Sequence, residues 1–120
     1  MIDIKAEGVP LGRTSGIIMA AADSLHPLVA RYQAGRADLE RTCLCIEHEV
    51  RTAALGCGGN WKDIRVMCDA ATQSPETLEA RKVRLTFGIK VGPTPEWTGG
   101  HFILGCELGA LMVEYQPWEV

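Results

Sequence analysis

A regular stripe of apolar residues in the first half of the chain constrains the fold more than any other feature. The stripe consists of Leu39, Cys43, Ile46, Val50, Ala53 and Cys57. Successive members are separated by four, three, four, three and four residues, so they lie within about 40° of one line on a helix. This spacing predicts an α-helix from about Asp38 to Leu55 that buries one side against the rest of the chain.

Another helix is predicted over residues 14–34, which precede the helix just described. Its apolar side chains fill an arc of roughly 120°, and Gly35 can end it. Pro27 lies on the side opposite that arc, so we expect one kinked helix or two short collinear helices. Because the connection through Gly35 is short, the two helices are predicted to be antiparallel neighbours.

The remaining segments change to a period of two residues or to short apolar runs. Alternation from Val83 to Val91 predicts the clearest strand, and shorter strands are expected at residues 2–6, at 64–68 and from His101 to Tyr115, with a break near Gly109. These segments predict the α+β class. A mostly antiparallel sheet of four or five strands packs on an antiparallel helix pair, in the order β-α-α-β-(α)-β-β.

The optional helix in that order rests on a local signal. Ser74 reads as a cap, Pro75 as a first-turn proline and Glu76 as a first-turn acid.

The last two strands are expected to pair with Leu85 opposite Leu108 and with Gly88 opposite Gly105. Phe87 then faces Cys106, and every apolar partner lies on one face.

Length and charge limit the classes of function. A chain of 120 residues suggests one domain, residues 1–120. A net charge of -3 with 12 basic residues argues against nucleic-acid binding, which depends on clustered Lys and Arg. No apolar run is long enough for a membrane span, and the first residues do not read as a secretory signal. Five cysteines then favour reduced thiols and a cytoplasmic location.

The cysteines do not have the spacing of a metal site. On a helix, Cys43 and Cys45 lie about 200° apart, so they cannot share one ion. Cys43 and Cys57 lie on the helix stripe and Cys106 on the inner face of a strand, where thiols pack as small hydrophobic groups. Cys68 lies at a strand end. The sequence therefore predicts neither a metal nor another cofactor.

Three residues are weak catalytic candidates. Cys45 lies on the exposed side of its helix, where Arg41 one turn away can favour the thiolate. His48 is the nearest base, and His101 is the third candidate. A nucleophilic site also needs an oriented base and an oxyanion-binding group. The enzyme hypothesis is thus a thiol- or histidine-dependent hydrolase or isomerase with a cleft at a subunit interface, and it is the alternative here.

A small-molecule cleft is predicted beside the segment "PTPEWTGGH". Trp97 and His101 lie on this expected loop, and Gly88 with Gly105 would leave a patch without side chains on the adjoining sheet. Paired glycines allow close approach of a ligand, and aromatic groups beside polar ones suit a binding cleft.

An interface is predicted from apolar residues on a second side of the helix and of the sheet. These residues are Leu44, Leu55, Ile103, Leu111, Val113 and Tyr115. Layers that are apolar on both sides need a second cover, and a two-fold dimer is the commonest solution. The leading hypothesis is therefore a non-enzymatic, homo-oligomeric binding or assembly module of the cytoplasm, with a small molecule or another protein as a further partner.

Overall fold

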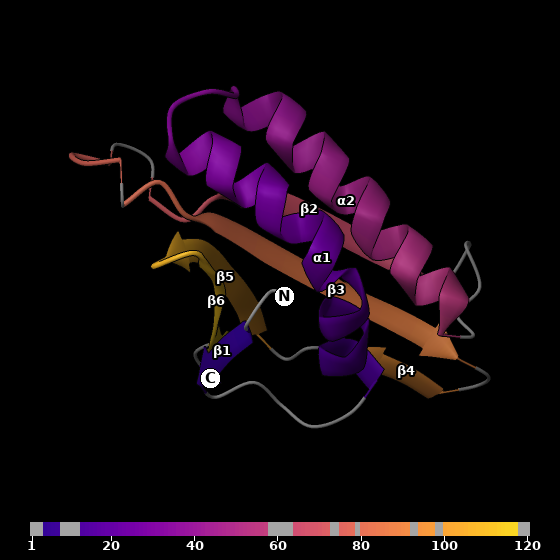
Figure 1. The fold of residues 1–120 in the computed structure, drawn as a ribbon. Helices are drawn as coiled ribbons and strands as arrows, with labels where there is room; N and C mark the ends of the chain where they lie inside the picture. Colours follow the sequence, from indigo (N-terminus) through magenta and orange to yellow (C-terminus); the bar gives the residue numbers. More distant parts are fainter. Residues whose placement is uncertain are drawn as a thin grey trace.

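The computed structural model describes residues 4–7, 13–57, 64–72, 75–78, 80–91, 94–97 and 100–117. Within these ranges two helices form one layer and six strands form the other (Figure 1). In chain order the elements are β1 Ile4–Glu7, α1 Arg13–Gln33, α2 Leu39–Gly56, β2 Ile64–Ala70, β3 Val83–Val91, β4 Thr94–Trp97, β5 Gly100–Glu107 and β6 Ala110–Pro117. The predicted α+β class and the mostly antiparallel sheet are confirmed, with one strand more than expected.

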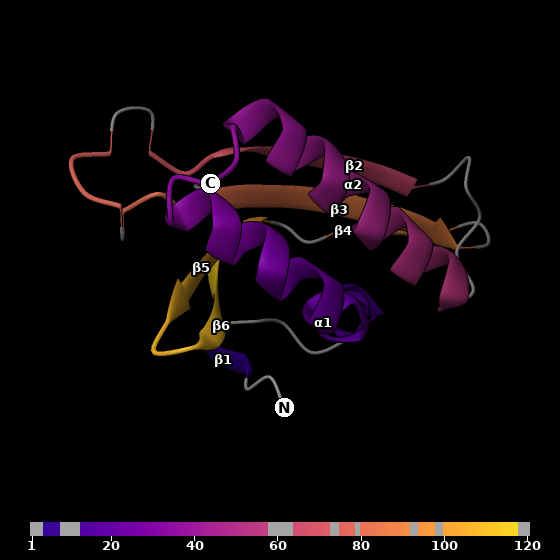
Figure 2. The same cartoon turned by 45° about the horizontal axis from the view of Figure 1, so that its top comes forward.

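The helix α1 follows the predicted arc and contains Pro27 without ending there. Its first turns run in a different direction from the remainder (Figures 1 and 2). A proline bends a helix over the preceding turn, because it has no N–H and its ring crowds the carbonyl four residues earlier. The helix ends at Gln33, and Gly35 follows two residues later with a φ of 76°, which is typical just after a helix C-terminus.

The helix α2 begins where the sequence predicts it. Asp38 is the N-cap, and its side chain accepts a hydrogen bond of 2.8 Å from the backbone N–H of Arg41. Thr42 donates its hydroxyl proton to the Asp38 carbonyl at 2.7 Å. The two helices lie side by side over one face of the sheet (Figure 2). Neither of them is long and apolar enough to cross a membrane.

The strands of the sheet have the order β1-β6-β5-β3-β2, and β4 pairs with the second half of β3. Only β1 runs parallel to its neighbour, β6, among the described pairs. The hairpin of β5 and β6 turns through Leu108 and Gly109, both with positive φ, as a two-residue hairpin loop requires.

The predicted pairing of β3 with β5 is wrong by six residues. Leu85 lies opposite Phe102, not opposite Leu108. The error is an even number, so Leu85, Leu104 and Cys106 keep their predicted inner face. The physical reason is β4, a strand that was not predicted, which occupies the second half of β3 and leaves only its first half to β5.

The optional helix is absent from the described residues. Bends cover residues 76–78, and a turn follows, in which the Ala80 N–H donates to the Thr77 carbonyl at 3.2 Å. Ser74 lies outside the described residues.

The core fills the space between the helix pair and the covered face of the sheet. Its largest fully buried side chains are Phe102, Ile17, Ile18, Leu25, Ile46, Leu85, Leu104, Leu111, Val29 and Val50. The opposite face of the sheet has no helix over it in the described part of the chain (Figures 1 and 2).

Candidate functional site

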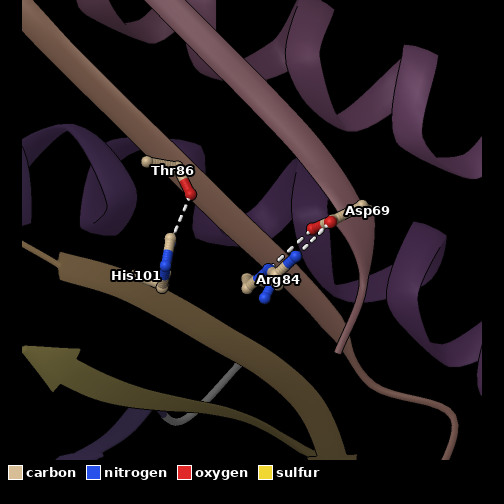
Figure 3. Close-up of polar contacts among 4 residues, drawn as sticks. All are labelled: Asp69, Arg84, Thr86 and His101. Atoms are coloured by element: carbon tan, nitrogen blue, oxygen red, sulfur yellow. Dashed lines mark hydrogen bonds and ion pairs between the residues drawn. The ribbon is translucent and has the colours of Figure 1, made fainter. Parts of the chain in front are cut away.

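The uncovered face of the sheet carries two polar pairs side by side (Figure 3). The first joins Asp69 of β2 to Arg84 of β3, which are register partners. The Arg84 Nε–H donates to Asp69 Oδ1 at 2.9 Å, and a second bond joins Nη2 to Oδ2. The pKa of Arg84 is raised by this hydrogen-bonded carboxylate and its charge, so the guanidinium stays charged. Both side chains remain well exposed, which makes the pair a surface ion pair.

The second pair joins Thr86 of β3 to His101 of β5. The Thr86 Oγ1 lies 2.5 Å from His101 Nδ1, and both side chains are half-buried. A hydroxyl beside an imidazole is one part of a nucleophilic site, which also needs an oxyanion-binding group and a group that orients the base. The sequence did not predict the role of Thr86, because the contact depends on the β3–β5 register.

The predicted glycine patch does not exist. Gly88 lies opposite Arg65 on one side and Trp97 on the other, whereas Gly105 lies opposite Met112. A Cβ placed on Gly105 would lie 3.1–3.3 Å from carbon atoms of the Lys82 side chain, so lysine covers this position. The expected loop is also wrong in part, because Trp97 ends the strand β4.

Half of the predicted interface lies on the covered face of the sheet. Leu111 and Val113 belong to the core and Tyr115 packs against it, so none of the three is on the outer face. Ile103 does lie on the outer face but is 7% exposed. The geometry of the β5–β6 turn explains why the predicted faces of the β6 residues are wrong. In this hairpin Cys106 pairs with Leu111, so inward positions are even-numbered in β5 and odd-numbered in β6.

The predicted second apolar line of α2 is confirmed as an exposed surface. Leu44 is 61% exposed and Leu55 is 41% exposed. His48, also exposed, lies between them on the same side of the helix.

A groove runs along the outer side of the helix pair, beside this line. One hollow, of about 490 Å³, is lined by Leu28, Arg31, Arg36, Ala37, Asp38, Arg41, Thr42 and Cys45. A second, of about 500 Å³, is lined by Ser24, Pro27, Leu28, Leu44, Cys45, His48 and Glu49. The hollows share Leu28 and Cys45, so they form one continuous groove with a cationic end and a mainly apolar end.

The cationic end holds three guanidinium groups, from Arg31, Arg36 and Arg41. Asp38 is the acid beside them, but its carboxylate caps α2. No ion pair joins these arginines to an acid within the residues that the structure describes.

The catalytic candidates are not brought together as a set. Cys45, His48 and Glu49 line the same part of the groove, whereas His101 lies on the uncovered face of the sheet, beyond the core. In the described structure no hydrogen bond joins the Cys45 thiol to the His48 imidazole.

The remaining cysteines follow the prediction with one exception and one addition. Cys43 is buried and Cys106 is half-buried on the inner face, as predicted. Cys57 is exposed instead of buried, because α2 ends at Gly56 and Cys57 leaves the helix as its C-cap. The addition is an interaction between the thiols of Cys43 and Cys68, which shifts the pKa of both and links α2 to β2.

Within the described ranges no three side chains of His, Cys, Asp or Glu gather closely enough to hold a metal ion. A scan against models of protein families, a search of curated proteins and a search of solved structures found no match to the chain. A functional proposal therefore rests on the geometry of the chain itself.

Proposed function

We propose that the chain is a non-enzymatic binding or assembly module that forms a homo-oligomer through the outer face of its helix pair. The observation that carries this proposal is the ridge formed by Leu44, His48 and Leu55 on α2, with both leucines largely exposed. A soluble surface gains little from such leucines unless another surface covers them. Five free thiols fit a reducing compartment such as the cytoplasm.

The spacing of the two leucines suits two-fold symmetry. They are eleven residues apart, so they lie about 20° apart around the helix and roughly 16 Å apart along it. Two α2 helices packed antiparallel about a two-fold axis then place Leu44 of each copy against Leu55 of the other. A two-fold interface buries the same patch on both subunits, so one ridge supplies both halves of the contact.

The groove extends this contact surface. Pro27 and Leu28 of α1 lie beside Leu44 at its apolar end, so a helix of a second copy meets side chains from both helices. Helix packing of this kind places ridges of one helix in grooves of the other. The uncovered face of the sheet supports association less, because it carries the Asp69–Arg84 and Thr86–His101 pairs.

The enzyme alternative has weaker support. Cys45, His48 and Glu49 do line one part of the groove. A thiol nucleophile needs a base in hydrogen-bond contact and a group that orients the base. The described structure provides neither contact for Cys45.

A native mass spectrum of the purified chain at neutral pH tests the proposal directly. We expect a dimer or a higher oligomer of the 13.0 kDa chain. The double variant Leu44→Glu/Leu55→Glu should shift the spectrum to monomer, with a rise in dissociation constant of at least about tenfold for each buried glutamate.

The matched control is Leu108→Asn. Leu108 is 95% exposed and has a φ of 53°, which asparagine tolerates. It lies on the β5–β6 turn, so its loss should leave the oligomer unchanged. A monomeric wild-type chain, or an oligomer that survives both glutamates, would overturn the proposal.

A further inference from the structure

A pair of thiols connects the two layers of the fold. Cys43 lies on the buried side of α2 and is 6% exposed. Cys68 is half-buried on the same face of β2 as Ile64 and Val66, the face that α2 covers. The two thiols interact with one another, and each shifts the pKa of the other.

Both cysteines belong to regular elements, so their contact does not depend on a loop. Cys43 lies in the second turn of α2, which Asp38 caps. Cys68 pairs with Leu85 inside the continuous β2–β3 ladder. Because α2 packs on β2 and the two thiols interact, an S–S bond of about 2 Å requires movement of the two side chains and not of the backbone elements.

The contact also differentiates the two sulfurs. The interaction with Cys68 lowers the pKa of Cys43, because a neighbouring thiol can donate a hydrogen bond to a thiolate. The same bond, together with burial, raises the pKa of Cys68. Burial and the charges of Glu47 and Asp69 oppose the thiolate at Cys43 but do not outweigh the hydrogen bond. When the pair loses one proton, the directions of the two pKa shifts favour the thiolate at Cys43.

We propose that Cys43 and Cys68 form a redox-active dithiol, which a hydroperoxide converts into an intramolecular disulfide between α2 and β2. In the first step the Cys43 thiolate attacks a peroxide oxygen of hydrogen peroxide. Cys43 becomes a sulfenic acid, and the hydroxide that leaves takes up the proton that Cys43 lost, which gives the first water. In the second step the Cys68 sulfur attacks the Cys43 sulfur, and the sulfenic oxygen leaves as water with the Cys68 proton. The dithiol loses two electrons and two protons in total, and one peroxide becomes two waters.

The other three cysteines lack this arrangement. Cys45 lies about 200° around α2 from Cys43, so it points away from β2. Cys57 lies beyond the end of α2. The Cys106 thiol donates to the His26 carbonyl at 3.8 Å, and burial raises its pKa. A disulfide formed within one chain should thus involve Cys43 and Cys68 alone.

The test treats the full, reduced chain with hydrogen peroxide at neutral pH and blocks the remaining thiols with an alkylating reagent. The expected product has lost about 2 Da, the mass of two hydrogens, and keeps three alkylated thiols. Its thermal midpoint should be higher than that of the reduced chain, and dithiothreitol should reverse both changes, because a cross-link restricts the unfolded chain.

Matched variants identify the partners, because trypsin leaves Cys43 and Cys45 on one peptide, between Arg41 and Arg51. Cys45→Ser should form the disulfide at the wild-type rate. Cys43→Ser and Cys68→Ser each lack one of the two sulfurs, so neither should form an intramolecular disulfide. Circular dichroism of each reduced variant confirms its fold, and fragmentation of the wild-type peptide locates the bond independently.

Three outcomes would overturn the proposal. The first is a disulfide that requires Cys45. The second is oxidation of Cys43 to a sulfinic acid without a cross-link. The third is a wild-type chain whose five thiols stay alkylatable under conditions that oxidise a free thiol.

Discussion

Phe102 and Ile103 are neighbours in β5, but they lie on opposite faces of the sheet in different surroundings. Phe102 is fully buried under the helix pair, and its ring centroid lies 5.4 Å from that of Tyr115 at a tilt of 54°. Ile103 is almost as well buried, yet its register partners are Arg84 and Glu114. Apolar packing under the helices surrounds Phe102, whereas the residues paired with Ile103 carry long polar side chains.

The difference shows that equal burial does not imply an equal contribution to stability. Truncation on the covered face leaves a cavity that rigid elements on both sides cannot close. Truncation on the uncovered face leaves a space that water and mobile side chains can fill. The two faces are therefore distinguished by what replaces a lost side chain.

The largest expected effect is that of Phe102→Ala. We expect it to lower the free energy of unfolding by about 3–5 kcal/mol, because transfer and cavity terms add. Ile103→Ala should cost about 1–2 kcal/mol, since mainly the transfer term is lost. Urea denaturation of both variants measures the difference.

Phe102→Leu is a useful second variant, because the alanine variant can approach the total stability of a small domain. Phe102→Leu should lower the free energy of unfolding by more than Ile103→Ala does and by less than Phe102→Ala does. Equal costs for Phe102→Ala and Ile103→Ala would show that the uncovered face is itself packed against something, such as a second copy of the chain.

Long periodic segments were predictable from the sequence. The helices α1 and α2 and the strand β3 each repeat their pattern over nine residues or more, so a single irregular position such as Pro27 does not hide the period. The strand β4 has four residues, including Pro95, and exists because it pairs with β3. Its formation depends on tertiary pairing, which local composition does not encode.

The prediction of which β6 residues face the core was wrong for a different reason. Alternation defines the inward residues within one strand, but a hairpin turn sets the phase of the next strand. Continuing the β5 alternation through Leu108 and Gly109 placed Leu111 and Val113 outside, whereas the two-residue turn places them inside. A register derived from the turn type would have avoided the error.

The sequence identified the exposed ridge on α2 but none of the three side-chain pairs that join different elements. Leu44 and Leu55 are recognisable because they lie off the buried stripe of their own helix. The contact of Cys43 with Cys68 depends on how α2 lies across β2. Periodicity reports which side of an element is buried, not which residue of another element it meets.

A smaller effect is expected for the Thr86–His101 pair on the uncovered face. Thr86→Val keeps the shape and the strand preference of threonine but removes the hydroxyl next to His101 Nδ1. We expect a loss of about 0.5–1 kcal/mol, because water can replace part of a half-buried hydrogen bond. Thr86→Ser, which keeps a hydroxyl, is the control and should lose less. If valine proves harmless, the hydrogen bond contributes nothing net to the fold.

The smallest effect should come from the Asp69–Arg84 ion pair, although two hydrogen bonds join its partners (Figure 3). Both partners are well exposed, so water screens their attraction and competes for their hydrogen bonds. A double-mutant cycle with Asp69→Asn and Arg84→Gln should give a coupling of about 0.2–1 kcal/mol that weakens as salt is added.

The salt dependence of this coupling energy is the decisive measurement. A coupling well above this range that persists in high salt would mean that the pair is shielded from water, and hence that the uncovered face is covered in solution. Phe102→Ala and Ile103→Ala would then lower the free energy of unfolding by similar amounts, because both faces of the sheet would be covered.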